Sequence, residues 1–389
     1  MKNSLLLVVN CLLLVTYSFA QVSHDLIPYA KEGKYGYADK SRKIVIEPKY
    51  DTAYLFYEGL AAVKTGDKMG YIDTKGTLVI PAKYDGCGNF NSGFGKVQVG
   101  GKWTIIDKTG KELTAPKYEM VYNFTDGLAP VQSGIKFGFI NTKGEEVIKP
   151  VYATVTEFKD GITAVQGDDG KISYLGTDGK KLVDKSFAHA LGFTEGLAAV
   201  ETEEGKWGFI DKKGSLVIPA DYDYVGQFSE GLASVSKHFK FGFIDKTGKE
   251  VIALEYDWSR DFSNGFCVVE KEEKFGYIDK TGKPLTDFIF EKANSFSSEG
   301  LALAVNKGLL VINAKGSVVV NRTYDAIGNY NEGMAAAKKG ELWGYIDANG
   351  KELIPTIYES ADDFDEGLGV VQLLGKSLFI DKQGNLFGE

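Results

Sequence analysis

Acidic side chains that recur at one place in a repeated pattern are the first candidates for chemistry in this sequence. Eight aspartates share one such position: Asp39, Asp73, Asp107, Asp211, Asp245, Asp279, Asp347 and Asp381. Together they could form a ladder of carboxylates. Each of them precedes a turn in phase, however, where an Asp side chain accepts hydrogen bonds from the backbone ahead of it. We therefore interpret these aspartates as turn caps.

A second set of acids stands directly before a Gly and an apolar residue. Its members are Glu58, Asp126, Asp160, Glu195, Glu230, Glu299, Glu332 and Glu366. We give them the same local explanation. Catalysis needs unlike residues that converge once, whereas a repeat presents the same residues many times. The acids therefore predict no catalytic residue.

The remaining motifs give no metal or cofactor site. The three histidines, His24, His189 and His238, share no spacing that could build a zinc site. The segment 168–170 lacks the alternating oxygen ligands of a calcium loop, and Gly93-x-Gly95 does not open a helix, as a phosphate loop would. No serine nucleophile elbow is present. We predict a protein that is not an enzyme and has no cofactor.

Aromatic residues make up 13% of the chain and could form stacking platforms for sugars or peptide side chains. Aromatic side chains also bury the most area per residue, so core packing is the favoured explanation and a platform the exception. The best candidates for a platform lie at one repeated position, where a Tyr hydroxyl would suit a partly solvated site. That position holds Tyr50, Tyr84, Tyr118, Tyr152, Phe187, Tyr222, Tyr256, Phe290, Tyr324 and Tyr358.

A repeat of 34 or 35 residues must position all of these side chains. Its anchor is Gly36, Gly70, Thr104, Gly138, Ser173, Gly208, Gly242, Gly276, Leu310, Gly344 and Leu378. Around Gly208, residues 207–210 predict a strand, residues 211–214 a turn with a left-handed Gly, and residues 216–218 the return strand. A third short strand follows the acid-Gly pair, as at residues 198–200. Each unit is thus predicted to be a three-stranded antiparallel meander.

The repeat resembles the WG repeat family, named for its Trp-Gly dipeptide. Trp207-Gly208 and Trp343-Gly344 carry the dipeptide itself, Phe137-Gly138 is a variant, and Trp103-Thr104 keeps only the Trp. The resemblance covers roughly residues 30–389. It implies a β-rich array of the kind used for binding or scaffolding in bacterial proteins, with no general activity attached.

We expect an all-β array over residues 35–389, most simply an elongated or curved solenoid, with ten full copies and a truncated eleventh at residues 377–389. The alternative is one or two β-propellers. Propeller blades usually have four strands and rings about four to eight blades, so ten three-stranded units fit a single ring poorly. The fifth and ninth copies have lost the anchor Gly, as Ser173 and Leu310. There we expect a looser backbone approach and not a site.

Residues 1–20 predict a cleavable secretory signal, with Lys2, an apolar run and Ala20 before the cut; residues 21–34 are a lead-in. We therefore expect an exported protein, in the periplasm, at the cell surface or outside the cell, with no membrane-spanning segment after cleavage. The net charge of −8 argues against nucleic acid and anionic membrane surfaces. Cys87 and Cys267 lie five copies apart, so we expect no disulfide between them.

The function favoured by the sequence is an exported, non-catalytic binding or scaffold protein whose partner is a protein or a glycan. Two alternatives stay open: a carbohydrate-active enzyme with a site in a groove formed by the repeats, and a structural surface spacer. One unlike copy with clustered acids would favour the enzyme, and a continuous aromatic face would favour binding.

Overall fold

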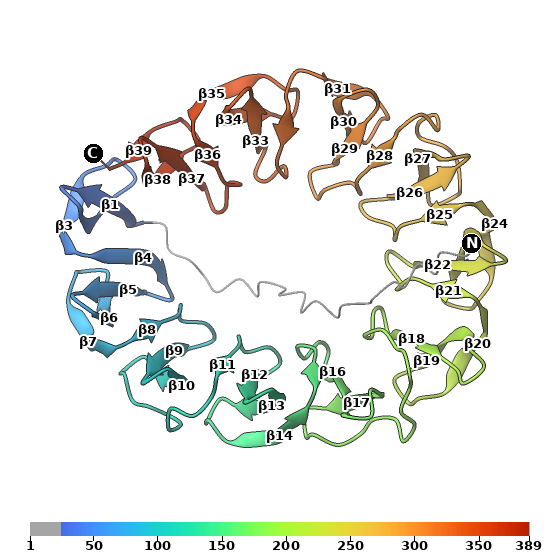
Figure 1. Cartoon of the computed structure of the whole chain (residues 1–389), viewed down its shortest axis with the longest axis horizontal. Coiled ribbons are helices and arrows are strands. Elements are labelled where there is room, and N and C mark those ends of the chain that lie inside the picture. The colour runs from blue at the N-terminus through green and yellow to red at the C-terminus, as the bar shows by residue number, and fades with distance from the viewer. Residues whose placement is uncertain (1–24, 389) are drawn as a thin grey trace, which may run out of the picture.

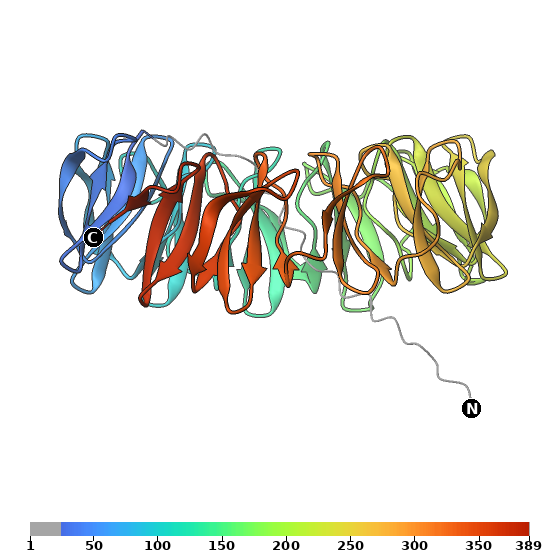
Figure 2. The same ribbon diagram turned by 90° about the horizontal axis from the view of Figure 1, so that it is seen from above.

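The computed structural model describes residues 25–388, and in this range the chain forms eleven small antiparallel sheets arranged in a ring (Figure 1). Seen from above, the ring is a flat disc, with the strands running between its two faces (Figure 2). The predicted secretory signal, residues 1–20, lies outside the described residues.

Each sheet is one blade of the ring. Blades 1 to 11 are β1–β3, β4–β7, β8–β10, β11–β14, β15–β17, β18–β20, β21–β24, β25–β27, β28–β31, β32–β35 and β36–β39. The second and third strands of a blade form its central hairpin. A short inner strand precedes them in nine blades, and an outer strand follows at the rim in eight.

The inner strands are β4 (Thr52–Tyr57), β8 (Gly86–Cys87), β11 (Met120–Val121), β15 (Thr154–Val155), β21 (Tyr224–Val225), β25 (Trp258–Ser259), β28 (Lys292–Ala293), β32 (Ala326–Ile327) and β36 (Ser360–Ala361). The second strands are β1 (Ile27–Lys31), β5 (Leu60–Thr65), β9 (Phe94–Val99), β12 (Leu128–Ser133), β16 (Ile162–Gln166), β18 (Leu197–Glu201), β22 (Leu232–Lys237), β26 (Phe266–Lys271), β29 (Leu301–Val305), β33 (Met334–Lys339) and β37 (Leu368–Leu373).

The third strands are β2 (Lys34–Ala38), β6 (Lys68–Asp73), β10 (Lys102–Asp107), β13 (Lys136–Asn141), β17 (Ile172–Gly176), β19 (Trp207–Asp211), β23 (Lys240–Asp245), β27 (Lys274–Asp279), β30 (Leu309–Asn313), β34 (Leu342–Asp347) and β38 (Lys376–Asp381). The outer strands are β3 (Ile44–Tyr50), β7 (Leu78–Tyr84), β14 (Glu146–Tyr152), β20 (Leu216–Tyr222), β24 (Glu250–Tyr256), β31 (Val318–Asn321), β35 (Glu352–Tyr358) and β39 (Leu386–Phe387).

The predicted three-stranded unit is wrong in detail. Within residues 25–388, six sheets have four strands and five have three. The additional strand lies in the segment interpreted as a polar connection, where eight of the nine inner strands have only two residues. Two residues cannot display the alternation that identifies a strand in sequence.

The predicted solenoid is also wrong, because the chain closes on itself as an eleven-bladed β-propeller. Strand β1 lies beside the last blade, and Ala30 pairs with Gly388 in a parallel bridge. Ile27 packs with Leu368 and Phe387 in one cluster across this junction. The first and last blades therefore share a core, which an open array would not have.

The number of blades could not be read from the repeat, because a blade begins at the inner strand and the repeat anchor lies on the third strand. Blades and repeats are therefore out of phase. The segment read as a truncated eleventh copy supplies β38 and β39 of blade 11. Strand β1, which completes the first sheet, comes from the segment assigned to the lead-in. The two fragments at the ends of the array thus belong to complete sheets.

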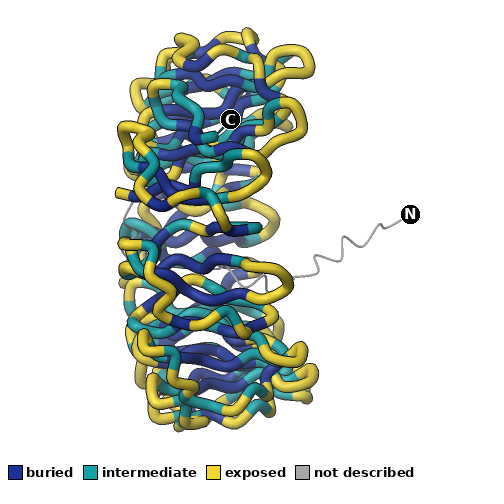
Figure 3. Tube along the Cα trace, turned by 90° about the vertical axis from the view of Figure 1, so that its left-hand side faces the viewer, coloured by how far each residue is buried: buried dark blue, intermediate teal, exposed yellow. Residues whose placement is uncertain are grey.

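The core of the ring lies between neighbouring blades. Phe209 and Ile218 of blade 6, for example, form one cluster with Val235 and Ile244 of blade 7. Figure 3 shows the buried residues in the middle of the strands and the exposed ones in the turns at both faces. Two faces thus remain for contact with other molecules. We call the face with the turns between second and third strands the tip face, and the opposite one the turn face.

Candidate functional site

The eight repeated aspartates cap turns, as predicted. At Asp211, the side-chain Oδ1 accepts hydrogen bonds from the backbone N–H groups of Lys213 and Ser215, both at 2.9 Å. Gly214 closes the turn with a φ of 81°. The other seven aspartates accept the same two backbone hydrogen bonds. Their carboxylates are thus occupied by the fold.

The acids before Gly have a different role from the local capping that was predicted. On the turn face, Glu230 of blade 7 accepts a hydrogen bond from the N–H of Gly265 in blade 8, at 3.0 Å from Oε2. Six such bonds join neighbouring blades, and their acceptors are Glu58, Asp126, Glu195, Glu230, Glu299 and Glu332. The partner lies 34–36 residues further on, which no local pattern reveals.

A lysine from the next blade completes several of these contacts. Lys280 lies 3.0 Å from Glu230 Oε2 and also donates to the Glu230 carbonyl oxygen, at 3.1 Å. Lys108, Lys246 and Lys382 pair in the same way with Glu58, Glu195 and Glu332. Burial opposes ionisation of Glu230, but Lys280 and the Gly265 N–H together lower its pKa. We call this arrangement the turn-face staple.

A third set of acids, on the tip face, also joins neighbouring blades. The sequence alone did not identify them. Asp223 follows Tyr222 directly, pairs with Lys206 of its own blade and accepts the N–H of His238 in the next blade, at 2.7 Å. The acids in this role are Asp51, Asp85, Glu119, Asp223, Asp257, Glu291, Asp325 and Glu359. In the sequence these residues can be recognised as the acid that directly follows each repeated aromatic, except at Tyr152 and Phe187.

Nine of the ten repeated aromatics are buried and Tyr152 is partly buried, so core packing is confirmed and the position is not a stacking platform. Tyr84 and Tyr118 are fully buried, and Phe290 is as well. The Tyr118 hydroxyl donates to Glu146 Oε1 of the next blade at 3.0 Å. Aromatic content in this chain therefore reflects packing between blades.

The inner rim of the ring carries polar side chains from the second strands and from the segments after the inner strands. Lys96 donates to Asn123 Oδ1 of the next blade at 2.8 Å, and Asn329 donates to Asp363 at 3.0 Å. Burial lowers the pKa of Lys96. Asp261 keeps contact with solvent on one side, while the protein packed on the other raises its pKa to about 6.

Other chemistry is sparse in the described part of the chain. Cys87 and Cys267 are free thiols, and burial raises the pKa of Cys87 to about 12. Within residues 25–388, no cluster of three or more His, Cys, Asp or Glu side chains is arranged to hold a metal ion. The same residues contain no helix of the length and apolarity needed to cross a membrane.

Three hairpin turns on the tip face expose large apolar side chains. Phe239 in blade 7 is 91% exposed, Leu374 in blade 11 is 86% exposed, and Ile135 in blade 4 is 80% exposed. No other large apolar residue in the described part of the chain exceeds 54%. Phe239 and Leu374 also have left-handed backbones, with φ of 63° and 52°. We call these three residues the apolar tips.

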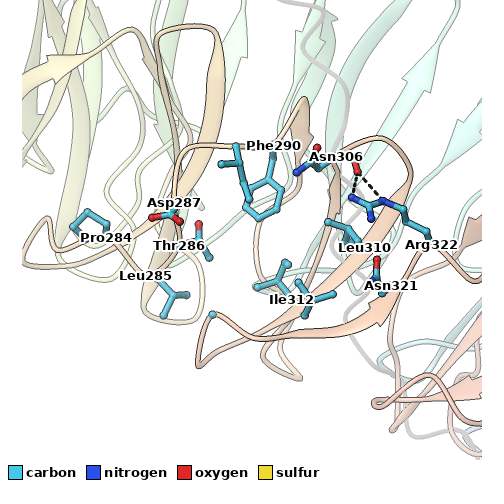
Figure 4. A pocket seen from close by; sticks show the side chains of 13 residues that line it. Pro284, Leu285, Thr286, Asp287, Phe290, Asn306, Leu310, Ile312, Asn321 and Arg322 are labelled. Atoms are coloured by element: carbon cyan, nitrogen blue, oxygen red, sulfur yellow. Dashed lines mark hydrogen bonds between the residues drawn. The ribbon is translucent and has the colours of Figure 1, made fainter.

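A pocket of about 510 Å³ lies between blades 8 and 9, at the degraded ninth copy (Figure 4). Its polar lining includes Thr286, Asp287, Asn306, Asn321 and Arg322. The apolar lining comes mainly from Leu285, Phe290, Leu310, Ile312 and Val318. The sequence predicted a looser backbone without a site at this copy.

A ring of eleven antiparallel blades with exposed turns at both faces defines the chain as a β-propeller. It belongs to the family described as WG containing repeat. The repeats match at residues 35–68, 69–103, 103–134, 137–171, 173–207, 207–238, 241–275, 275–309, 311–343 and 343–376. The resemblance proposed from the Trp-Gly dipeptides is confirmed.

No curated protein matches the sequence. Among solved structures, the chain is similar to a eukaryotic initiation factor at 12% identity, with a TM-score of 0.41, over 92% of this chain and 93% of that one. It is similar to the computationally designed Ika8 protein at 14% identity and a TM-score of 0.38, over 68% and 93%. It is similar to BamB from Moraxella catarrhalis at 12% identity and a TM-score of 0.33, over 68% of this chain and 91% of that one. The architecture described above comes from the chain's own sheets and not from these likenesses.

Proposed function

We propose that this propeller is an exported, non-catalytic binding platform that docks a protein partner on its tip face. The observation that carries the proposal is the set of apolar tips, Ile135, Phe239 and Leu374, which are exposed far more than any other large apolar side chain among residues 25–388. They belong to blades 4, 7 and 11 and are therefore spread around the ring. A partner covering them would bury a broad part of one face.

The backbone is left-handed at two of the tips, where a glycine would be less strained than the apolar residue. A left-handed conformation costs an L-residue roughly 1–2 kcal/mol, and glycine avoids this cost. The corresponding turn of blade 3 uses Gly100 and Gly101. Blade 7 instead has His238 and Phe239, both with positive φ. The same turn of blade 8 also has positive φ, at Glu272 and Glu273, so the exposed apolar side chain and not the backbone alone sets these tips apart.

The chemistry of the tips favours a protein over a glycan. Ile135 and Leu374 have no ring on which a sugar could stack, whereas aliphatic and aromatic side chains together match the apolar centre of protein interfaces. The turns of blades 6 and 8 add Glu203, Glu204, Glu272 and Glu273 to the same face. These acids would favour a partner with a basic rim.

The enzyme alternative has less support. Glycoside hydrolysis uses a pair of carboxyl groups about 5–10 Å apart. The lining of the pocket between blades 8 and 9 contains a single acid, Asp287. The eight turn aspartates accept backbone hydrogen bonds, and six of the eight acids before Gly bond the next blade. A surface spacer would have no use for exposed apolar tips.

The test is a comparison of capture from envelope extract by three forms of the protein. The first is wild type, the second carries Ile135→Ser, Phe239→Gly and Leu374→Gly, and the third is a control with Val45→Ser, Val217→Ser and Leu353→Ser. The control removes apolar surface from outer strands that are also partly exposed. We expect one partner whose recovery falls at least about tenfold with the tip variant only.

Thermal melting separates loss of contact from loss of folding. Because glycine relieves the left-handed strain, the tip variant should melt at or above the wild-type temperature. Recovery of the same proteins by wild type and tip variant, in equal amounts, would contradict docking on the tip face.

A further inference from the structure

The pocket between blades 8 and 9 exists because two neighbouring copies lose the regular outer strand. In blade 8 the return segment makes only isolated bridges, Phe275 with Phe290 and Ile278 with Pro284. In blade 9 the anchor is Leu310, and the outer strand β31 has four residues where others have seven. The two changes leave an opening at the rim between the blades.

Arg322 shows how the chain adapts to Leu310. Its N–H donates to the Leu309 carbonyl at 2.8 Å, and its backbone is left-handed, with a φ of 54°. The aliphatic part of the side chain packs on Gly308, where a Cβ would lie 2.9 Å from Arg322 Cγ. The side chain is thereby directed toward the pocket (Figure 4).

The guanidinium of Arg322 is fixed by hydrogen bonds that leave several of its N–H donors free. Nε and Nη2 both donate to the Asn306 carbonyl oxygen, at 2.9 and 2.7 Å. This leaves the Nη1–Nη2 edge for an end-on pair of hydrogen bonds, the geometry that suits a carboxylate. The sequence has only three arginines, and this one replaces residues such as Ala220 and Thr356 of regular outer strands.

Charge and shape define the ligand further. Figure 4 shows Arg322 and Asn306 at one end of the pocket and Asp287 with Thr286 at the other, with Ile312 between them. A molecule that fits has a carboxylate at one end, an amine at the other and an apolar body. The volume of about 510 Å³ lies within the range of about 300–1,000 Å³ for small-molecule sites.

We propose that this pocket binds a whole short apolar peptide, with its C-terminal carboxylate on Arg322 and its free amine on Asp287. Thr286, Asn306 and Asn321 add polar groups to the lining, although the Thr286 hydroxyl oxygen already accepts a hydrogen bond from the Tyr277 N–H at 3.2 Å. The pocket lies at the outer rim, so the proposal does not rest on docking at the tip face.

The experiment is titration calorimetry with the tripeptide Ala-Ala-Leu against the full chain. The ligand is compared with its C-terminal amide and its N-acetyl form. Arg322→Gly is the decisive variant, because glycine keeps the left-handed backbone without strain. Arg42→Gly is its matched control, since Arg42 is also left-handed, with a φ of 66°, but lies in a turn of blade 1.

We expect saturable binding by wild type and by Arg42→Gly. Amidation of the peptide and Arg322→Gly should each weaken it at least about tenfold, the loss expected for a bidentate charged pair. Acetylation and Asp287→Asn should each weaken it about threefold or more, because Asp287 is exposed. The melting temperature of Arg322→Gly should equal or exceed that of wild type.

Three results would overturn binding of a peptide carboxylate at Arg322. They are no saturable binding up to about 10 mM, equal affinity for the free and amidated peptides, and unchanged binding by Arg322→Gly. Equal affinity for the free and acetylated peptides would exclude a peptide amine at Asp287 and so overturn the assignment to peptides.

Discussion

Gly208 illustrates why the repeat carries a Gly after its aromatic residue. A Cβ at this position would lie 2.6 Å from the Ile218 carbonyl oxygen and 2.7 Å from the Ala220 nitrogen of β20. The register between β19 and β20 shifts here, as in a β-bulge. Every seven-residue outer strand lies opposite an anchor glycine: Gly36, Gly70, Gly138, Gly208, Gly242 and Gly344. The anchors Thr104, Ser173, Leu310 and Leu378 face shorter or interrupted outer strands.

Gly208→Ala should destabilise the protein by about 1–3 kcal/mol, because the added carbon meets backbone atoms that cannot move aside without disturbing β20. Gly276→Ala is the control. There the nearest atoms belong to the Phe288 ring, at 2.9 Å, in a blade without a regular outer strand. Since a ring can rotate, the cost should be clearly smaller. Urea denaturation of both variants measures the difference, and equal costs would show that the glycine does not serve the bulge.

Residue roles could be predicted where the partner is local. Asp211 and Gly214 are four positions or fewer from the groups they contact, so turn chemistry alone identified them. Glu230 contacts residues 35 and 50 positions away, and Tyr118 one 28 away. A single repeat contains no trace of these contacts, because they form only after blades meet. The same limit hid the pocket residue Arg322, whose role depends on the loss of Gly at Leu310.

At the scale of elements, the turn-face staple ties each blade to the next. Glu230, with a φ of 54°, ends blade 7's connection between inner and second strands, and its carboxylate reaches Gly265 and Lys280 of blade 8. The side chain is 28% exposed, so the interaction is partly shielded from water. A charge-assisted hydrogen bond of this kind contributes about 1.5–3 kcal/mol at most.

Glu230→Ala should therefore lower the free energy of unfolding by about 1–2 kcal/mol at neutral pH. Because the pKa of Glu230 is lowered in the folded state, its contribution is present above the unfolded pKa, about 4.3, and is lost as the pH falls through the folded value. The gap between wild type and variant should thus shrink near pH 3. Denaturation at pH 7 and pH 3 checks this, with Glu204→Ala at an exposed tip as control. A gap that is absent at pH 7, or unchanged at pH 3, would contradict the staple.

Most elements could be predicted because their pattern is strong. The strand expected at residues 207–210 is β19, Trp207–Asp211, and the one expected at 198–200 is β18, Leu197–Glu201. The return strand expected at 216–218 continues as β20 to Tyr222. The inner strands were missed because they are too short to show an alternating pattern: β21 holds only Tyr224 and Val225, and both pair with β22.

At the scale of the whole molecule, the fold depends on a rotation that no single unit encodes. Eleven blades close a ring when each turns by about 33° relative to its neighbour. A slightly different rotation would give an open solenoid from the same strands. Residues at both ends of the chain decide the outcome: Ile27 packs with Leu368 and Phe387, and Ala30 pairs with Gly388. These contacts are invisible in a pattern read copy by copy.

Ring closure is tested most directly by pulsed electron paramagnetic resonance between spin labels on equivalent turns. Ser41 in blade 1, Lys213 in blade 6 and Gln383 in blade 11 are exposed at the same turn position and can be changed to Cys in a background without native cysteines. The ring predicts a short distance between positions 41 and 383 and a long one between 41 and 213. An open array with about 10 Å per unit would give the reverse order, with roughly 100 Å between 41 and 383 and about half of that between 41 and 213. A distance between 41 and 383 that exceeds the one between 41 and 213 would contradict the closed propeller.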